Sequence, residues 1–105
     1  MRGALAAVAA CCCCTVLLAA DPPPGRAKSQ MCATCHGPLG VSVTPDAPHL
    51  AGQPRIYLEA QLKAFRSGAR RHEVMNVIAK PLADADIEAL ADWYSSLLVE
   101  AREKR

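Results

Sequence analysis

Aromatic residues are scarce in this chain of 105 residues, at 4% of the sequence, with one tryptophan, one phenylalanine and two tyrosines. A chain of this length holds a single domain, so its core must come from aliphatic side chains or from something that it binds. An excess of one charge is also lacking, because Lys and Arg number 12 and Asp and Glu number 10. This balance excludes the strongly basic face that a nucleic-acid partner requires.

The first twenty residues have only one charge, Arg2, followed by a run of small and apolar residues over 3–20. This pattern is typical of a secretory signal peptide, and a cut after Ala20 leaves a mature chain that starts at Asp21. Two alternatives stay open: the stretch 8–11 reads like a lipoprotein cleavage box, and residues 3–20 fall just short of the ~20 apolar residues of a membrane anchor. We expect residues 1–20 to be a signal peptide and the protein to be exported to the periplasm, with membrane association through residues 3–20 as the alternative.

Cysteine is almost absent from the expected mature chain. Four of the six cysteines, Cys11–Cys14, lie in the signal, where they act as small apolar side chains. Only Cys32 and Cys35 remain, and His36 follows them directly in the stretch MCATCHGPLG. A disulfide framework is therefore excluded, and the chemistry of these three residues has to be explained in another way.

The spacing Cys-x-x-Cys-His favours covalent haem attachment over other thiol chemistry. A structural zinc site needs four ligands, but His49 and His72 lie far apart in the sequence, and a thioredoxin-like dithiol needs a sheet that the sequence does not predict. A disulfide between Cys32 and Cys35 would close a very small loop and stabilise little. We therefore expect one haem c, bound through Cys32 and Cys35 and ligated by His36, which also supplies the core that ~85 residues with few aromatics lack. A zinc or dithiol module is the remaining alternative.

The residue opposite His36 decides what the iron can do. Histidine alone leaves an open position, which suits a haem enzyme or a gas-sensing domain, whereas histidine with methionine closes the site and raises the reduction potential. We favour Met75, because it lies between two predicted helices and its soft thioether suits ferrous iron. His72 and His49 are the alternatives.

The pattern beyond the signal predicts an all-α domain over residues 21–105. After a short Pro-rich leader at 21–25, the sequence favours helices from 25 or 26 to the haem motif, over 54–68, over 72–80 and from 84 to the end of the chain. Residues 37–54 hold four prolines and three glycines and are predicted to be a long loop. In the last helix we expect Asp84 as the N-cap and three basic residues at the C-terminal end, namely Arg102, Lys104 and Arg105. The apolar face of that helix is predicted to contain Ile87, Leu90, Ala91, Tyr94, Leu97 and Leu98.

Three stretches in order, MCATCHGPLGVS, PHLAGQPRIYLEAQLKAFRSGARR and VMNVIAKPLADADIEALADWYSSL, resemble the class I cytochromes c of the small bacterial cytochrome c553 and c4 type. The resemblance covers most of residues 25–100. It implies three to four helices wrapped around one covalently attached haem, with the first and last helices crossing. It also implies Met75 as the distal ligand. Four further residues match positions around the haem pocket: Pro48, whose carbonyl oxygen would accept the His36 ring N–H, and Gln53, Tyr57 and Arg66.

This resemblance implies an electron carrier that is not an enzyme on its own. Its partners would be a donor dehydrogenase or cytochrome complex and an acceptor oxidase or reductase of a respiratory chain. Cytochromes c4 carry two such domains, whereas this chain has one haem motif, so a subunit of a larger dehydrogenase or oxidase complex, or pairing with a second cytochrome domain, are alternatives. A basic cluster is a candidate for contacts with haem propionates or an acidic partner, and consists of Lys63, Arg66, Arg70 and Arg71.

Overall fold

The described part of the chain, residues 18–105 of a computed structural model, folds into helices and loops without a strand. The helices are α1 (Pro24–Lys28), α2 (Gln30–His36), α3 (Arg55–Ser67), α4 (Glu73–Ala79) and α5 (Asp84–Ser95). This confirms the prediction of an all-α fold. Most of the expected signal peptide, including the run Cys11–Cys14, lies outside the described residues. Among residues 18–105, no helix combines the length and the hydrophobicity that a membrane crossing requires.

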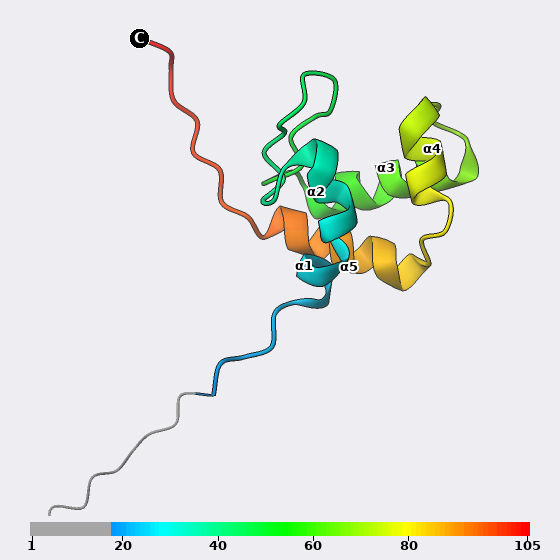
Figure 1. Cartoon of the computed structure of the whole chain (residues 1–105), viewed down its shortest axis with the longest axis horizontal. Coiled ribbons are helices and arrows are strands. Elements are labelled where there is room, and N and C mark those ends of the chain that lie inside the picture. The colour runs from blue at the N-terminus through cyan, green and yellow to red at the C-terminus, as the bar shows by residue number, and fades with distance from the viewer. Residues whose placement is uncertain (1–17) are drawn as a thin grey trace, which may run out of the picture.

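The first and last helices cross at Gly25, as Figure 1 shows where α1 passes α5. Gly25 is buried, and a Cβ atom on it would lie 2.0 Å from the Ala89 carbonyl oxygen and 2.7 Å from Trp93 Cβ. Glycine is therefore the residue that allows the two backbones to approach so closely. The Arg26 guanidinium lies 5.8 Å from the centre of the Trp93 ring, and Lys28 pairs with Asp86 at 2.9 Å. The crossing that the resemblance implied is present.

Replacing Gly25 with alanine is expected to destabilise the haem-loaded protein. The added methyl group would overlap a backbone carbonyl of α5, which cannot turn aside as a side chain can, so α1 and α5 must separate. Overpacking of this kind costs about 1–3 kcal/mol. Denaturant unfolding of the wild type and of Gly25→Ala measures the change, with Ala27→Ser on the exposed side of α1 as the control. Equal unfolding free energies for Gly25→Ala and the control would contradict the predicted overlap.

The N-terminal helical segment begins earlier than predicted and is divided in two. Pro24 occupies the first helical position, where its missing N–H costs nothing, so the extended leader ends at Pro23. The helix is interrupted at Ser29, which is buried and whose hydroxyl donates to the Arg26 carbonyl at 2.8 Å. This local hydrogen bond takes a backbone acceptor of α1, and the chain continues as α2 with the haem motif.

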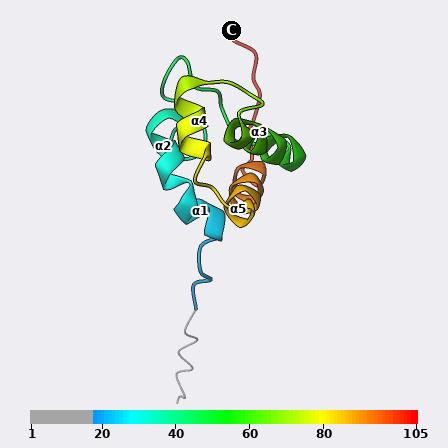
Figure 2. The ribbon, with the colours of Figure 1, turned by 90° about the vertical axis from the view of Figure 1, so that its right-hand side faces the viewer.

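The central helix α3 has the boundaries that its sequence predicts. Pro54 precedes its first residue, and Gly68 ends it with a φ of 83° while donating its N–H to the Phe65 carbonyl. Leu58 and Phe65 are buried, and Leu62 packs at the edge of the same core. Figure 2 shows α3 on the side of the domain opposite to α2 and α4, so its apolar face is directed at the middle of the molecule.

The last helix ends at Ser95, ten residues earlier than predicted. Ser96 ends the helix with its hydroxyl donating to the Trp93 carbonyl at 2.6 Å, and the Gly52 N–H donates to the Tyr94 carbonyl at 2.9 Å. These bonds satisfy carbonyl groups that would otherwise continue the helix. The expectation that Leu98 lies on the buried face was therefore wrong, because it is 100% exposed. The basic residues at 102, 104 and 105 lie in an extended segment and not at a helix end.

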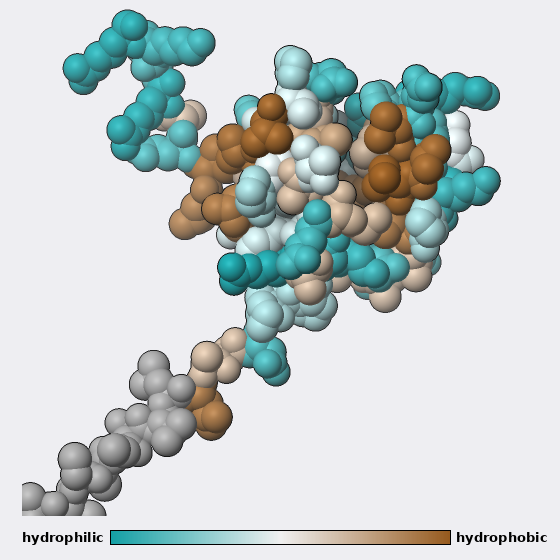
Figure 3. Space-filling view, in the orientation of Figure 1, coloured by the Kyte–Doolittle hydropathy of each residue, from teal (hydrophilic) through white to brown (hydrophobic). Residues whose placement is uncertain are grey.

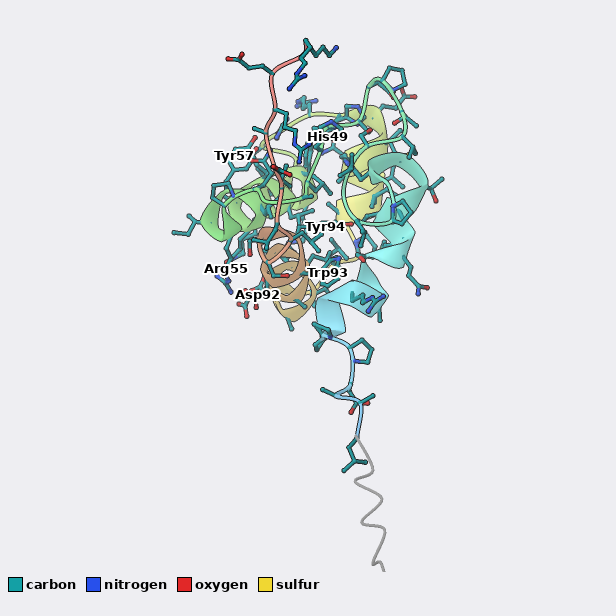
Figure 4. All side chains as sticks on the ribbon, turned by 90° about the vertical axis from the view of Figure 1, so that its left-hand side faces the viewer. His49, Arg55, Tyr57, Asp92, Trp93 and Tyr94 are labelled. Carbon is teal, nitrogen blue, oxygen red and sulfur yellow. The ribbon has the colours of Figure 1, made fainter. Side chains whose placement is uncertain are left out.

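The start of α5 is also tied to the rest of the domain. Ala83 takes the N-cap position, one residue before the predicted Asp84, and its N–H donates to Asp86 Oδ2 at 3.0 Å. Asp84 instead accepts from the Arg66 guanidinium at 2.6 Å, and this bond holds the pKa of the Asp84 carboxyl below its ordinary value. At the other end of the helix, Figure 4 shows Arg55 beside Asp92 on the outer side of α3 and α5, where the two form an ion pair.

Residues 37–54 form a long loop, as their proline and glycine content predicted, and Gly40 closes it. The Gly40 carbonyl oxygen accepts from Leu50 N at 2.7 Å and from Ala51 N at 3.1 Å, which brings the two ends of the loop together. Gly40 has a φ of 72°, and a Cβ on it would lie 2.8 Å from the Tyr94 ring. The loop therefore rests directly on α5, and Tyr94 is buried beneath it.

Candidate functional site

A cavity of about 500 Å³ lies between α2, the loop 37–54, α3, α4 and α5. This volume is in the range of roughly 300–1,000 Å³ that is typical of sites for small molecules and cofactors. Most of its wall is apolar, and the side chains that form this part of the wall include Leu50, Leu58, Leu62, Phe65, Ile78 and Leu90. The chain has few aromatic side chains that could fill a space of this size.

Helix α2 places the three residues of the haem motif on the cavity wall. Cys32, Cys35 and His36 all line it, because residues three and four apart lie on one face of a helix. Both cysteines are half-buried and form no disulfide with each other. Before haem is attached, burial raises the pKa of the Cys32 thiol above its ordinary value. The spacing of the motif thus presents two thiols and one imidazole to the same space.

The ring of His36 is held by the opposite loop. His36 is only 7% exposed, and its Nδ1 lies 2.8 Å from the carbonyl oxygen of Pro48. The carbonyl can only accept, so Nδ1 carries the proton and Nε2 has a free lone pair. Pro48 is therefore the contact that the resemblance implied. An imidazole fixed in this tautomer is suited to ligating a metal through Nε2.

Met75 lies on α4 and lines the same cavity, half-buried. His72 also lines it but is not on the helical face of Met75, because it has an extended conformation as the N-cap of α4. Its Nδ1 accepts the N–H of Met75 at 3.1 Å. His49 is in the loop, as expected, and its Nδ1 accepts from Ser42 N at 2.7 Å. Each histidine thus uses one ring nitrogen in a local hydrogen bond, whereas no hydrogen bond engages the thioether of Met75.

Of the other expected pocket residues, two line the cavity and one does not. Gln53 and Tyr57 are on its wall, and Figure 4 shows Tyr57 on the same side of the domain as His49. Arg66, which was expected to line or flank the pocket, is not among the residues that line the cavity. Its guanidinium donates to the Leu82 carbonyl at 3.0 Å and to Asp84, so it ties α3 to the start of α5. Asp84 lies eighteen residues after Arg66, and no local sequence pattern predicts that the two side chains meet.

The basic cluster does not act as one unit. Lys63 pairs with Glu59 at 2.7 Å within α3, and Arg66 binds Asp84. Only Arg70 lines the cavity, with its guanidinium 4.6 Å from the centre of the Phe65 ring and a hydrogen bond to Gln61 at 2.8 Å. A cation held in this way at the cavity is placed for a carboxylate of a bound molecule.

The residues of the cavity fit a covalently held haem. An apolar space is lined by two thiols with the required spacing, by an imidazole with a free Nε2 and by a thioether. A zinc site receives no support from residues 18–105, where no three His, Cys, Asp or Glu side chains come together as metal ligands. The imidazole and the thioether are donors of the kinds that ligate haem iron in proteins.

Sequence reasoning did not identify two features of the site. One is the role of His72 as a helix cap, which the extended stretch before an acidic helix start could have suggested. The other is Asn76, which follows Met75 and whose side chain binds three backbone groups outside α4 or at its start. No local pattern predicts these partners, because they depend on how α4 folds back on α3.

The family model described as Cytochrome c matches residues 25–97. Cytochrome c-554(548) of Halomonas halodenitrificans is 40% identical over 75 residues, which are 69% of this chain and 90% of that protein. The thiosulfate dehydrogenase electron acceptor of Thiomonas intermedia is 48% identical over 68 residues, but these make up 31% of its length. Among solved structures, reduced recombinant cytochrome c4 from Pseudomonas stutzeri has a TM-score of 0.69 at 35% identity, over 76% of this chain and 47% of that chain. These similarities confirm the class I cytochrome c fold that the sequence predicted.

Proposed function

Because the chain belongs to the cytochrome c family and its cofactor is covalently bound haem c, we propose that it is a periplasmic monohaem electron carrier with His36 and Met75 as axial ligands. Cys32 and Cys35 hold the haem through thioether bonds in this proposal. The bound group supplies one-electron exchange between its ferric and ferrous states. The chain itself forms no bond with a substrate and is not an enzyme.

The observation that carries this proposal is that four donors share one apolar cavity. The two thiols and His36 come from α2, and Met75 comes from α4, so the cavity has candidate ligands from separate elements. The Pro48 carbonyl keeps the proton of His36 on Nδ1 and leaves Nε2 to the iron. His72 is the weaker candidate, because its Nδ1 already caps the helix that carries Met75.

The residues around the cavity are suited to a haem iron that changes its oxidation state while it keeps both axial ligands. The apolar side chains of α3, α4 and α5 exclude water from the cavity, which favours the ferrous state with its lower charge. Arg70 on the cavity wall adds a positive charge in the same direction. Methionine as the second ligand raises the potential further. A carrier between respiratory proteins needs a potential of this kind and no open position at the iron.

The partners in this proposal are other redox proteins. Two relatives are named thiosulfate dehydrogenase electron acceptors, which supports a dehydrogenase as the donor, and the acceptor would be an oxidase or reductase. The chain spans 32% and 31% of these two relatives and 47% of cytochrome c4. A subunit of a dehydrogenase or oxidase complex, or a haem domain paired with another, is accordingly a second form of the same function.

The test is the visible and near-infrared spectrum of the protein made in a host that attaches haem. We expect a c-type spectrum that survives acid–acetone extraction, and a weak near-infrared band in the ferric form from the bond between sulfur and iron. Carbon monoxide should bind slowly or not at all to the ferrous form. Rapid carbon monoxide binding without the near-infrared band would instead identify an open site, as in a haem enzyme or a gas sensor.

A further inference from the structure

The side chain of Asn76, next to Met75 on α4, makes three hydrogen bonds, all to backbone atoms. Its Nδ2 donates to the carbonyl oxygens of Phe65 and Arg70, both at 2.8 Å. Its Oδ1 accepts from the N–H of His72, also at 2.8 Å. Both N–H donors of the amide are thus engaged. These bonds join α4 to the last turns of α3 and to the connection 68–72.

Helix α4 has few other contacts that fix its position. It has seven residues, too few for a helix that is stable by itself. Ala79 is its one buried residue, Val77 is 70% exposed, and Val74, Met75 and Ile78 line the cavity. Figure 3 accordingly shows apolar side chains on the surface over the region where α4 lies in Figure 1. A helix of seven residues with one residue in the core opens easily unless the bound group or other bonds hold it.

His72 connects the Asn76 bonds to Met75 itself. The His72 N–H donates to Asn76 Oδ1, its carbonyl accepts the Asn76 N–H at 3.0 Å, and its ring Nδ1 accepts the Met75 N–H at 3.1 Å. The arrangement is related to a capping box. His72 is the N-cap, and the side chain that binds its N–H belongs to Asn76, the fourth helical residue, where a capping box uses the third. Loss of the Asn76 amide therefore removes the bond to the backbone N–H of His72, the residue whose ring caps Met75.

We propose that Asn76 is a positioning residue that keeps α4, and with it the Met75 thioether, in the cavity, so that external ligands replace the thioether slowly. This inference rests on the proposed function, because it takes Met75 as the axial ligand. The same bonds account for how so short and exposed a helix can carry a ligand. An exogenous anion can reach the iron only when the thioether has left, so the rate of its binding reports how often α4 opens.

The experiment compares cyanide binding to the ferric, haem-loaded wild type and to its variant Asn76→Ala. Three hydrogen bonds are lost, so we expect binding to be at least about tenfold faster at saturating cyanide. The near-infrared band should still be present at 25 °C but should disappear at a lower temperature than in the wild type. Asn76→Ser, which keeps an acceptor for the His72 N–H, should be intermediate.

Ser67→Ala is the matched control, because the Ser67 hydroxyl also binds backbone groups, Ala64 O in α3 at 3.2 Å and Ala69 N in the α3–α4 connection at 3.3 Å, and neither bond involves α4. It should leave the cyanide rate within about twofold of the wild type. Equal rates for Asn76→Ala and Ser67→Ala, or a variant that attaches haem but is globally unfolded, would overturn the positioning role. If the wild type itself lacks the near-infrared band, the proposed ligation by Met75 fails; if the band is present and Asn76→Ala binds cyanide at the wild-type rate, only this inference fails.

Discussion

Met75→Ala is expected to keep its haem while losing the near-infrared band and gaining rapid binding of carbon monoxide and cyanide. In the proposed attachment the haem is bound through Cys32 and Cys35, which both lie on α2, so a change in α4 leaves these two bonds intact. Removal of the thioether leaves His36 as the one strong ligand, and the potential should fall, on the order of 0.1 V or more within the ~0.8 V range that axial ligands span. Redox titration and ligand-binding kinetics measure both effects.

Val77→Ala is the control for this variant, because it shortens a side chain of the same helix that is exposed to solvent. Its spectrum and potential should match those of the wild type. A Met75→Ala protein with an unchanged near-infrared band and potential would show that another residue ligates the iron. His72 and His49 would then be the residues to replace next, since both line the cavity.

Cys32→Ala combined with Cys35→Ala is expected to abolish covalent haem and, with it, the folded state. The cavity of about 500 Å³ has a mostly apolar wall, which would be exposed to water without haem. A small domain is stable by only ~5–15 kcal/mol, so the loss of this burial is enough to unfold it. The chain without haem should therefore lose most of its helical circular dichroism and be degraded in the host.

The control is Thr34→Ser, which changes an exposed residue between the two cysteines and keeps their spacing. Haem content by the pyridine haemochrome method and helicity by circular dichroism should be those of the wild type. The single variants Cys32→Ala and Cys35→Ala each retain one thiol and should give reduced yields of haem-loaded protein. A double variant that folds with native helicity and no haem would contradict the role of haem as the centre of the core.

The haem motif and α3 could be predicted because the information for each is local. Two thiols and an imidazole at fixed spacing lie on one helical turn wherever the chain folds, and Pro54 and Gly68 define the two ends of α3 by their own backbone preferences. The cavity could be expected as well, because a chain with few aromatics leaves its centre unfilled. In each case the structure follows from the chemical properties of the residues themselves.

The errors arose where a distant segment decides the local structure. The apolar pattern of α5 continues to Leu98, but the helix ends at Ser95, where the loop residue Gly52 binds the Tyr94 carbonyl. The bond between Arg66 and Asp84, which lies beyond α4 in the sequence, was not predicted either. The three bonds of Asn76 are of the same kind. Periodicity describes one element at a time and says little about such contacts.

The close approach of Gly25 to Ala89 bears on the order in which the protein matures. Gly25 precedes the haem motif, and Ala89 lies in the last helix, which follows all other elements of the cavity. Their contact is therefore among the last native contacts that a growing or translocating polypeptide can make. Until it forms, Cys32 and Cys35 remain accessible on an open polypeptide. We expect the attachment machinery to act on this open form, so that bond formation to the porphyrin precedes the docking of the two terminal helices and commits the polypeptide to its final shape.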